Sequence, residues 1–146
     1  MFKKNKHLQA VVMAGLALLL ATCAPATTPA RASGMTFAKN ADGYADITVE
    51  QLASMLSQKG FTLINVHVPY EGEIAQTDMF IPYDQIGDHL DALPAKDAPI
   101  VLYCRSGRMS TDAAKVLAGL GYTNIMEVDG GFSAWESAGY ELLKKP

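Results

Sequence analysis

Residues 99–117 read PIVLYCRSGRMSTDAAKVL, and this stretch contains an apolar run, a short basic loop and a helix-forming segment in direct succession. The apolar run over residues 100–103 is typical of a strand that is buried on both faces. Residues 111–120 have a helical pattern that ends before Gly121. Cys104 therefore follows the carboxyl end of a predicted strand, where open parallel sheets bind their ligands.

The remainder of the chain after residue 44 repeats this alternation of strand and helix. Thr48 and Gln51 form a capping-box pattern at the start of one helix. We expect helices at residues 49–58, 84–93, 111–120 and 133–138, and strands at 45–47, 61–66, 100–103 and 124–128, with an irregular segment at 68–83. Continuous apolar strands that alternate with helices predict an α/β fold, in which helices cover both faces of a parallel sheet. A single domain over residues 44–146 accommodates this pattern.

The first 22 residues are predicted to be a signal peptide. Three lysines at positions 3, 4 and 6 precede an apolar stretch, residues 10–21, that is too short to span a bilayer comfortably. Cys23 follows at once in a sequence, Leu-Ala-Thr-Cys, that resembles the lipobox of bacterial lipoproteins. We expect lipid attachment at Cys23 and export to a periplasmic or cell-surface position on a membrane. Cleavage after Ala26 and an uncleaved anchor are the alternatives.

The amino-acid composition predicts a tether and argues against two kinds of ligand, nucleic acid and metal ions. Residues 23–43 are rich in Ala, Pro, Thr, Ser and Gly, which predicts a flexible tether. The net charge is −3, and removal of the three lysines in residues 1–22 makes it −3 − 3 = −6, which argues against nucleic acid as a partner. The three histidines lack metal-ligand spacing, so we expect neither a metal nor a cofactor.

Cys104 lies in surroundings that favour an ionised thiol. With Cys23 assigned to lipid, Cys104 lacks a disulfide partner, and such a cysteine in an oxidising compartment is either buried or reactive. Loop amides, a following helix N-terminus and the charges of Arg105 and Arg108 stabilise a thiolate. Gly107 allows the loop to curl, and Ser110 is the expected N-cap. An inert, buried cysteine is the alternative.

The loop Tyr-Cys-Arg-Ser-Gly-Arg-Met-Ser (residues 103–110) and the downstream Asp-Gly-Gly-Phe-Ser-Ala-Trp (129–135) resemble the rhodanese family of sulfurtransferases. The resemblance covers roughly residues 45–143. It implies that the Cys104 thiolate takes sulfur from a thiosulfate-like donor, forms a persulfide, and passes the sulfur to a thiol or a cyanide-like acceptor. It also implies a set of loop residues that hold the anion: Arg105, Ser106, Gly107, Arg108 and Met109.

Two segments depart from the family pattern. Asn65-Val66-His67 stands where rhodaneses usually have Asp-Val-Arg, and we expect His67 to be a structural hydrogen-bonding residue. Residues 71–82 replace the usual Gly-His-Ile element, and the acidic side chains in this segment would repel thiosulfate if they faced the sulfur: Glu71, Glu73 and Asp78.

Three other functions are alternatives to sulfur transfer. A phosphatase loop of the Cys-x5-Arg type needs arginine at position 110, where this chain has serine. A thiol redox role lacks a resolving cysteine near Cys104. A non-catalytic module that carries sulfur or binds a partner remains the main alternative to the enzyme.

Overall fold

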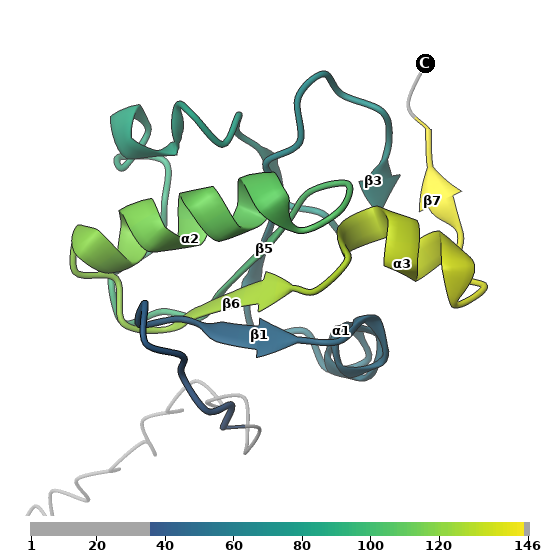
Figure 1. The fold of residues 1–146 in the computed structure, drawn as a ribbon, viewed down its shortest axis with the longest axis horizontal. Helices are drawn as coiled ribbons and strands as arrows, with labels where there is room; N and C mark the ends of the chain where they lie inside the picture. Colours follow the sequence, from purple (N-terminus) through teal and green to yellow (C-terminus); the bar gives the residue numbers. More distant parts are fainter. Residues whose placement is uncertain (1–35, 145–146) are drawn as a thin grey trace, which may run out of the picture.

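Five parallel strands form the centre of the computed structural model, which describes residues 36–144 (Figure 1). Neighbouring strands pair in the order β1 (Ala45–Ile47), β6 (Ile125–Val128), β5 (Ile100–Tyr103), β2 (Thr62–Asn65) and β4 (Met79–Phe80). Every pairing in this sheet is parallel. The predicted α/β fold with a parallel sheet is therefore confirmed.

Helices cover the two faces of this sheet, each over its own apolar cluster (Figure 1). On one face, α2 (Arg108–Gly119) and the short 3₁₀ helix η1 (Ile86–Asp88) pack over Ile100 and Leu102. On the other face, α1 (Val49–Leu56) and α3 (Gly131–Ser137) pack over Val101 and Tyr103. Because successive strand residues point to opposite faces, β5 needs apolar side chains at every position.

The helix predicted for residues 84–93 is wrong. Only η1 forms there, and the chain then continues in turns closed by hydrogen bonds from Ala92 N to His89 O and from Leu93 N to Leu90 O. Ile86 and Leu93 are both buried in the core under α2. Burial of these two side chains favours tight turns over a regular helix. Gly87 disfavours the helix further, because glycine has a low helix propensity.

The segment predicted to be irregular, residues 68–83, contains two short strands. Besides β4, it holds β3 (Glu73–Ile74), which pairs antiparallel with β7 (Leu142–Leu143) near the end of the chain. A strand of two residues has no sequence period, so the pattern could not reveal it. The predicted capping box of α1 is present, with Thr48 Oγ1 accepting from Gln51 N at 3.3 Å and Gln51 Oε1 accepting from Thr48 N at 2.7 Å.

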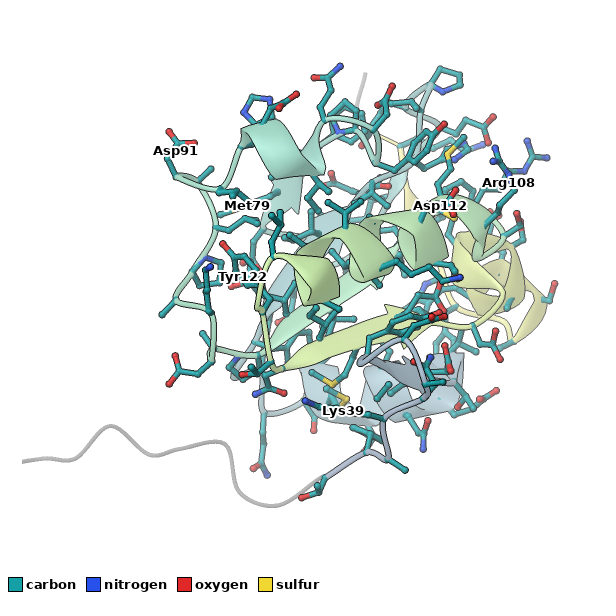
Figure 2. The ribbon with its side chains drawn as sticks, turned by 60° about the vertical axis from the view of Figure 1, so that its left-hand side comes forward. Lys39, Met79, Asp91, Arg108, Asp112 and Tyr122 are labelled. Carbon is teal, nitrogen blue, oxygen red and sulfur yellow. The ribbon has the colours of Figure 1, made fainter. Side chains whose placement is uncertain are left out.

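The predicted signal peptide and Cys23 lie outside the described residues. The last part of the predicted tether, residues 36–43, contacts the domain. Lys39, labelled in Figure 2, donates from Nζ to Thr123 O at 2.6 Å, and Asp42 Oδ2 lies 3.2 Å from Lys115 Nζ. Within residues 36–144, no helix has the length and apolar character needed to cross a bilayer.

Candidate active site

Cys104 lies directly after β5, at the carboxyl edge of the central sheet. The residue is 1% exposed, and its thiol forms no disulfide. Sγ accepts a hydrogen bond from Gly107 N at 3.1 Å and another from Ser110 Oγ at 3.3 Å. Both donors point partial positive charge at the sulfur, which stabilises negative charge there.

Gly107 is the residue at which the loop turns into α2. Its φ of 97° lies in the region that side chains rarely adopt, and this conformation aims its N–H at the sulfur. Gly107 is also the N-cap of α2, and its carbonyl accepts from Thr111 N at 2.9 Å. The sulfur therefore lies beside the positive end of the helix dipole.

The prediction that Ser110 caps this helix is wrong, because α2 starts at Arg108. Ser110 is fully buried within the helix. Its hydroxyl lies 3.0 Å from Gly107 O and 2.5 Å from Glu127 Oε1, in addition to its contact with the sulfur. The side chain thus links the cysteine to a carboxyl group on the neighbouring strand.

Glu127 is the functional candidate that the sequence reasoning missed. It lies on β6, is 1% exposed, and is reached by Ser110 from above the sheet. Burial raises the pKa of the Glu127 carboxyl to about 7, and the hydrogen bond from Ser110 opposes part of that rise. The sequence does contain a clue to Glu127, because this acidic residue interrupts the apolar strand Ile-Met-Glu-Val and acidic residues are rarely buried.

Arg105 and Arg108 are exposed and pair with carboxylates. Arg105 Nη1 lies 3.2 Å from Glu71 Oε1, and Arg108 Nη1 lies 3.9 Å from Asp112 Oδ2. In Figure 2, the Arg108 side chain extends outward from the first turn of α2. The two guanidinium groups therefore lie at the surface of the site, whereas the sulfur is bound by the buried donors Gly107 N and Ser110 Oγ.

The two other loop residues expected to bind the anion lie in different surroundings. Ser106 is exposed between the two arginines, and Met109 is half-buried and packs against the core under α2. Of the five predicted binding residues, Gly107 is the one with a hydrogen bond to the sulfur in the described structure.

His67 packs against Phe132, whose backbone N–H donates to Cys104 O. The His67 ring is buried and meets the Phe132 ring edge-on, with centroids 5.2 Å apart. Its Nε2 lies 3.6 Å from Glu71 Oε2, and neither ring nitrogen has a hydrogen-bond partner within the described residues. The expected structural hydrogen bond of the ring is therefore absent there. The backbone N–H of His67 instead donates to Asn65 Oδ1 at 3.0 Å.

The three acidic residues of the unusual segment occupy different places. Glu71 contacts Arg105 at the active-site loop. Glu73 is buried on β3, where its Oε2 accepts from Tyr70 Oη at 3.3 Å. Asp78 binds Lys59 and the backbone of β2 at Leu63. Among the three carboxylates, Glu71 is the one that opposes an incoming anion at this loop.

Gly131 allows α3 to dock on the cysteine loop. Phe132 N donates to Cys104 O and Ser133 N donates to Arg105 O, each at 2.9 Å. A Cβ on Gly131 would lie 2.2 Å from Cys104 O, closer than any side chain tolerates. The absence of a side chain at Gly131 thus permits close backbone contact between α3 and the cysteine loop.

A surface pocket of about 360 Å³ lies against the outer side of this loop. Arg105 and Lys144 contribute positive charge to it, and Glu71 and Glu136 contribute negative charge. Phe132 contributes an apolar wall. The buried Cys104 does not line the pocket in this structure. Within residues 36–144, no group of His, Cys, Asp and Glu side chains is arranged to hold a metal ion.

Comparisons with known proteins identify relatives of this site. The family model of the rhodanese-like domain matches residues 48–138. A thiosulfate sulfurtransferase GlpE of Pseudomonas syringae is 30% identical over 87 residues, which are 58% of this chain and 81% of that protein. A sulfurtransferase of Allochromatium vinosum is 30% identical over 103 residues, covering 67% of this chain and 94% of that protein. A crystal structure of a rhodanese-related protein from Thermoplasma volcanium superposes with a TM-score of 0.60 at 27% identity, over 68% of this chain and 98% of that one.

Proposed function

The chain belongs to the rhodanese-like domain family, and from this premise we propose that it is a sulfurtransferase that forms a persulfide on Cys104. One observation carries the proposal. The Cys104 sulfur receives hydrogen bonds from Gly107 N and Ser110 Oγ at the start of α2. A thiolate is favoured at a helix N-terminus with donors of this kind, and only the thiolate is nucleophilic.

The reaction has two balanced halves. The Cys104 thiolate attacks the outer sulfur of thiosulfate, a new S–S bond forms, and sulfite leaves with the electron pair of the broken S–S bond. The resulting persulfide anion is then attacked at its outer sulfur by a thiolate or cyanide, which carries that sulfur away and restores the Cys104 thiolate. This is covalent catalysis by one nucleophile that serves both substrates.

The positive charges at the surface of the site favour binding of an anionic sulfur donor. Arg105 lines the pocket, and Arg108 is exposed at the first residue of α2. Fixed positive charges raise the local concentration of an anion and speed its arrival. Glu71 competes for the Arg105 guanidinium, so a donor must displace this carboxylate to bind there.

We also propose that the protein is exported and anchored to a membrane through a lipid on Cys23. The support is the basic and apolar sequence of residues 1–22, followed directly by cysteine. Metabolic labelling with a radioactive fatty acid tests this proposal. Label that is lost in Cys23→Ser supports the anchor, whereas unlabelled wild-type protein overturns it.

A sulfur carrier without turnover is the second candidate function. Two observations favour it: Cys104 is 1% exposed, and Glu71 already occupies Arg105. A carrier would accept sulfur from a protein partner able to open the site, and free thiosulfate would then react poorly.

Intact-protein mass spectrometry separates the two functions. The chain is incubated with thiosulfate and we expect the mass of one added sulfur, absent in Cys104→Ser. Addition of cyanide should remove the sulfur and yield many thiocyanate molecules per protein. An adduct that is discharged only once supports the carrier. The absence of any Cys104-dependent adduct overturns the enzyme.

A further inference from the structure

The Ser110 hydroxyl is surrounded by more acceptors than its single proton can serve. Three acceptor atoms lie within hydrogen-bond distance: Cys104 Sγ at 3.3 Å, Gly107 O at 3.0 Å and Glu127 Oε1 at 2.5 Å. A hydroxyl has one proton to donate and two lone pairs with which to accept. A second proton, carried by either the thiol or the carboxyl, is therefore needed to satisfy this cluster.

Gly107 O already accepts from Thr111 N, and two arrangements of the protons satisfy the contacts among Cys104, Ser110 and Glu127. In one, the Cys104 thiol donates to Ser110 Oγ, and Ser110 donates to the Glu127 carboxylate. In the other, protonated Glu127 donates to Ser110 Oγ, and Ser110 donates to the Cys104 thiolate. Both arrangements carry one negative charge in total, and they differ only in which end of the cluster holds it.

The surroundings of Glu127 disfavour a permanent charge there. From β1, Asp46 lies in register beside it, and Asp129 follows two residues later on its own chain segment. Both carboxylates raise the pKa of Glu127 further, after the larger effect of burial. From β5, the residue in register with Glu127 is the apolar Leu102.

The nearby cations are engaged elsewhere. On α2, Arg108 pairs with Asp112, and Lys115 pairs with Asp42. None of the ion pairs formed by residues 36–144 includes Glu127. Since an uncompensated buried charge is costly, the carboxyl is ready to accept a proton near neutral pH.

We propose that Cys104, Ser110 and Glu127 form a proton relay in which Glu127 receives the proton that Cys104 loses on ionisation. The S–H bond of Cys104 breaks and its proton passes to Ser110 Oγ, while the original Ser110 proton passes to the Glu127 carboxylate. The net charge of the cluster stays at −1 throughout. Its catalytic use rests on the proposed function, because it supplies the thiolate that attacks the donor.

This relay assigns Glu127 a positioning role, since it acts through Ser110 and does not contact the sulfur. It explains how a buried thiol ionises while both arginines pair with carboxylates at the surface. A neutral Glu127 also keeps a second negative charge away from the persulfide anion. At higher pH, where both ends are ionised, this benefit is lost.

Thiolate titration in the ultraviolet tests the relay. The full chain carrying Cys23→Ser leaves Cys104 as its one thiol, and thiolate absorbance is followed against pH. Coupled groups ionise in two steps that belong to the pair. We expect two steps of thiolate absorbance more than about one pH unit apart. Glu127→Gln should give one step, below the upper step of the parent chain.

Two variants serve as controls. Glu73→Gln neutralises another buried carboxyl, on β3, and should retain both steps. Ser110→Ala removes the connection between the two ends, and should leave a single thiolate step at higher pH because the thiolate loses a donor. Identical titrations of the parent chain and Glu127→Gln would overturn the relay.

If Glu127→Gln does not fold, infrared spectroscopy of the chain that keeps Glu127 tests the relay instead. In the relay, thiolate absorbance rises while the C=O band of a protonated buried carboxyl persists. If that band disappears completely before any thiolate forms, Glu127 ionises independently and the relay is wrong. These titrations use no sulfur donor, so their failure is distinguishable from a failure of the mass-spectrometric test of sulfur transfer.

Discussion

The inner and outer sides of the cysteine loop are built on different physical principles. On the inner side, Gly107, Ser110 and Glu127 are buried and contact the sulfur or one another at short distances. On the outer side, Arg105 and Arg108 have side chains that are 57% and 71% exposed and pair with surface carboxylates. Buried polar contacts are strong and costly to break, whereas exposed ion pairs are weak and screened by salt.

This difference separates two tasks. The inner side fixes the position and the charge of the sulfur, and changes there should affect both stability and chemistry. In the proposed reaction the outer side meets the donor, so changes there should alter binding of the donor with little effect on the fold. Substitutions on the two sides test this division.

Gly131→Ala should have the largest effect. The new Cβ would lie 2.2 Å from Cys104 O, and the φ of 55° already disfavours a side chain. We expect a loss of about 4 kcal/mol or more in the free energy of unfolding, and loss of persulfide formation. Urea denaturation and intact-mass analysis measure the two effects.

Gly139→Ala is the matched control for this substitution. Gly139 has a φ of 88° but no atom within 4 Å of its Cβ position, so it carries the backbone strain without the clash. We expect a cost of about 1–2 kcal/mol and normal persulfide formation. Equal effects of the two variants would show that contact between α3 and the loop is unimportant.

The pH dependence of stability is the next largest effect. The pKa of Glu127 rises from 4.5 to about 7 in the folded state, so between these values the folded protein binds more protons than the unfolded chain. Stability should therefore fall as pH rises from about 4.5 to 7, by about 3 kcal/mol in total. Urea denaturation across this range should show that Glu127→Gln lacks this part of the decline.

Glu141→Gln, which neutralises an exposed carboxylate near β7, is the control for Glu127→Gln. It should follow the parent protein at every pH. If Glu127→Gln keeps the full pH dependence, the buried carboxyl is not the group that titrates.

The sequence predicted the inner side only in part. Apolar strands and the Cys-to-helix loop predicted the positions of Cys104 after a strand and Gly107 in the turn that follows, because local backbone requirements leave a local pattern. Ser110 was assigned to the wrong role, since its contacts depend on where α2 begins. Glu127 was missed because its partner Ser110 is 17 residues away in the chain and meets it only after β5 and β6 pair.

The outer side was less predictable for a related reason. The sequence contains the charges of both Arg105 and Glu71, but their pairing depends on a loop closed by Asn65 Nδ2, which donates to Gly72 O at 2.9 Å. A buried asparagine that binds a backbone carbonyl leaves no sequence period. The same holds for η1, where the burial of Ile86 overrides the helical pattern.

Glu71→Gln should produce a smaller effect, confined to substrate binding. Removal of the carboxylate frees Arg105 for the donor and removes repulsion of an anion. An exposed pair of this kind contributes about 0.5–1 kcal/mol, so the KM for thiosulfate should fall about two- to fivefold, while the urea midpoint stays unchanged. Steady-state thiocyanate formation measures the change in KM.

Asp112→Asn is the matched control, because it frees Arg108 in the same way. It should change KM less, since the Arg108 pair is longer and lies away from the pocket that Arg105 lines. A larger effect of Asp112→Asn would indicate that the donor binds on the α2 side of the loop and not on the Glu71 side.

Arg108→Gln should have the smallest effect of all. Its guanidinium is the more exposed of the two, so it acts on an anionic donor mainly through long-range attraction. We expect KM to rise about twofold at low ionic strength and to match the parent protein in about 1 M salt, where the Debye length is about 3 Å. An effect that persists in high salt would require direct contact between Arg108 and the donor. In that case the outer side of the loop holds its substrate by hydrogen bonds, as the inner side holds the sulfur.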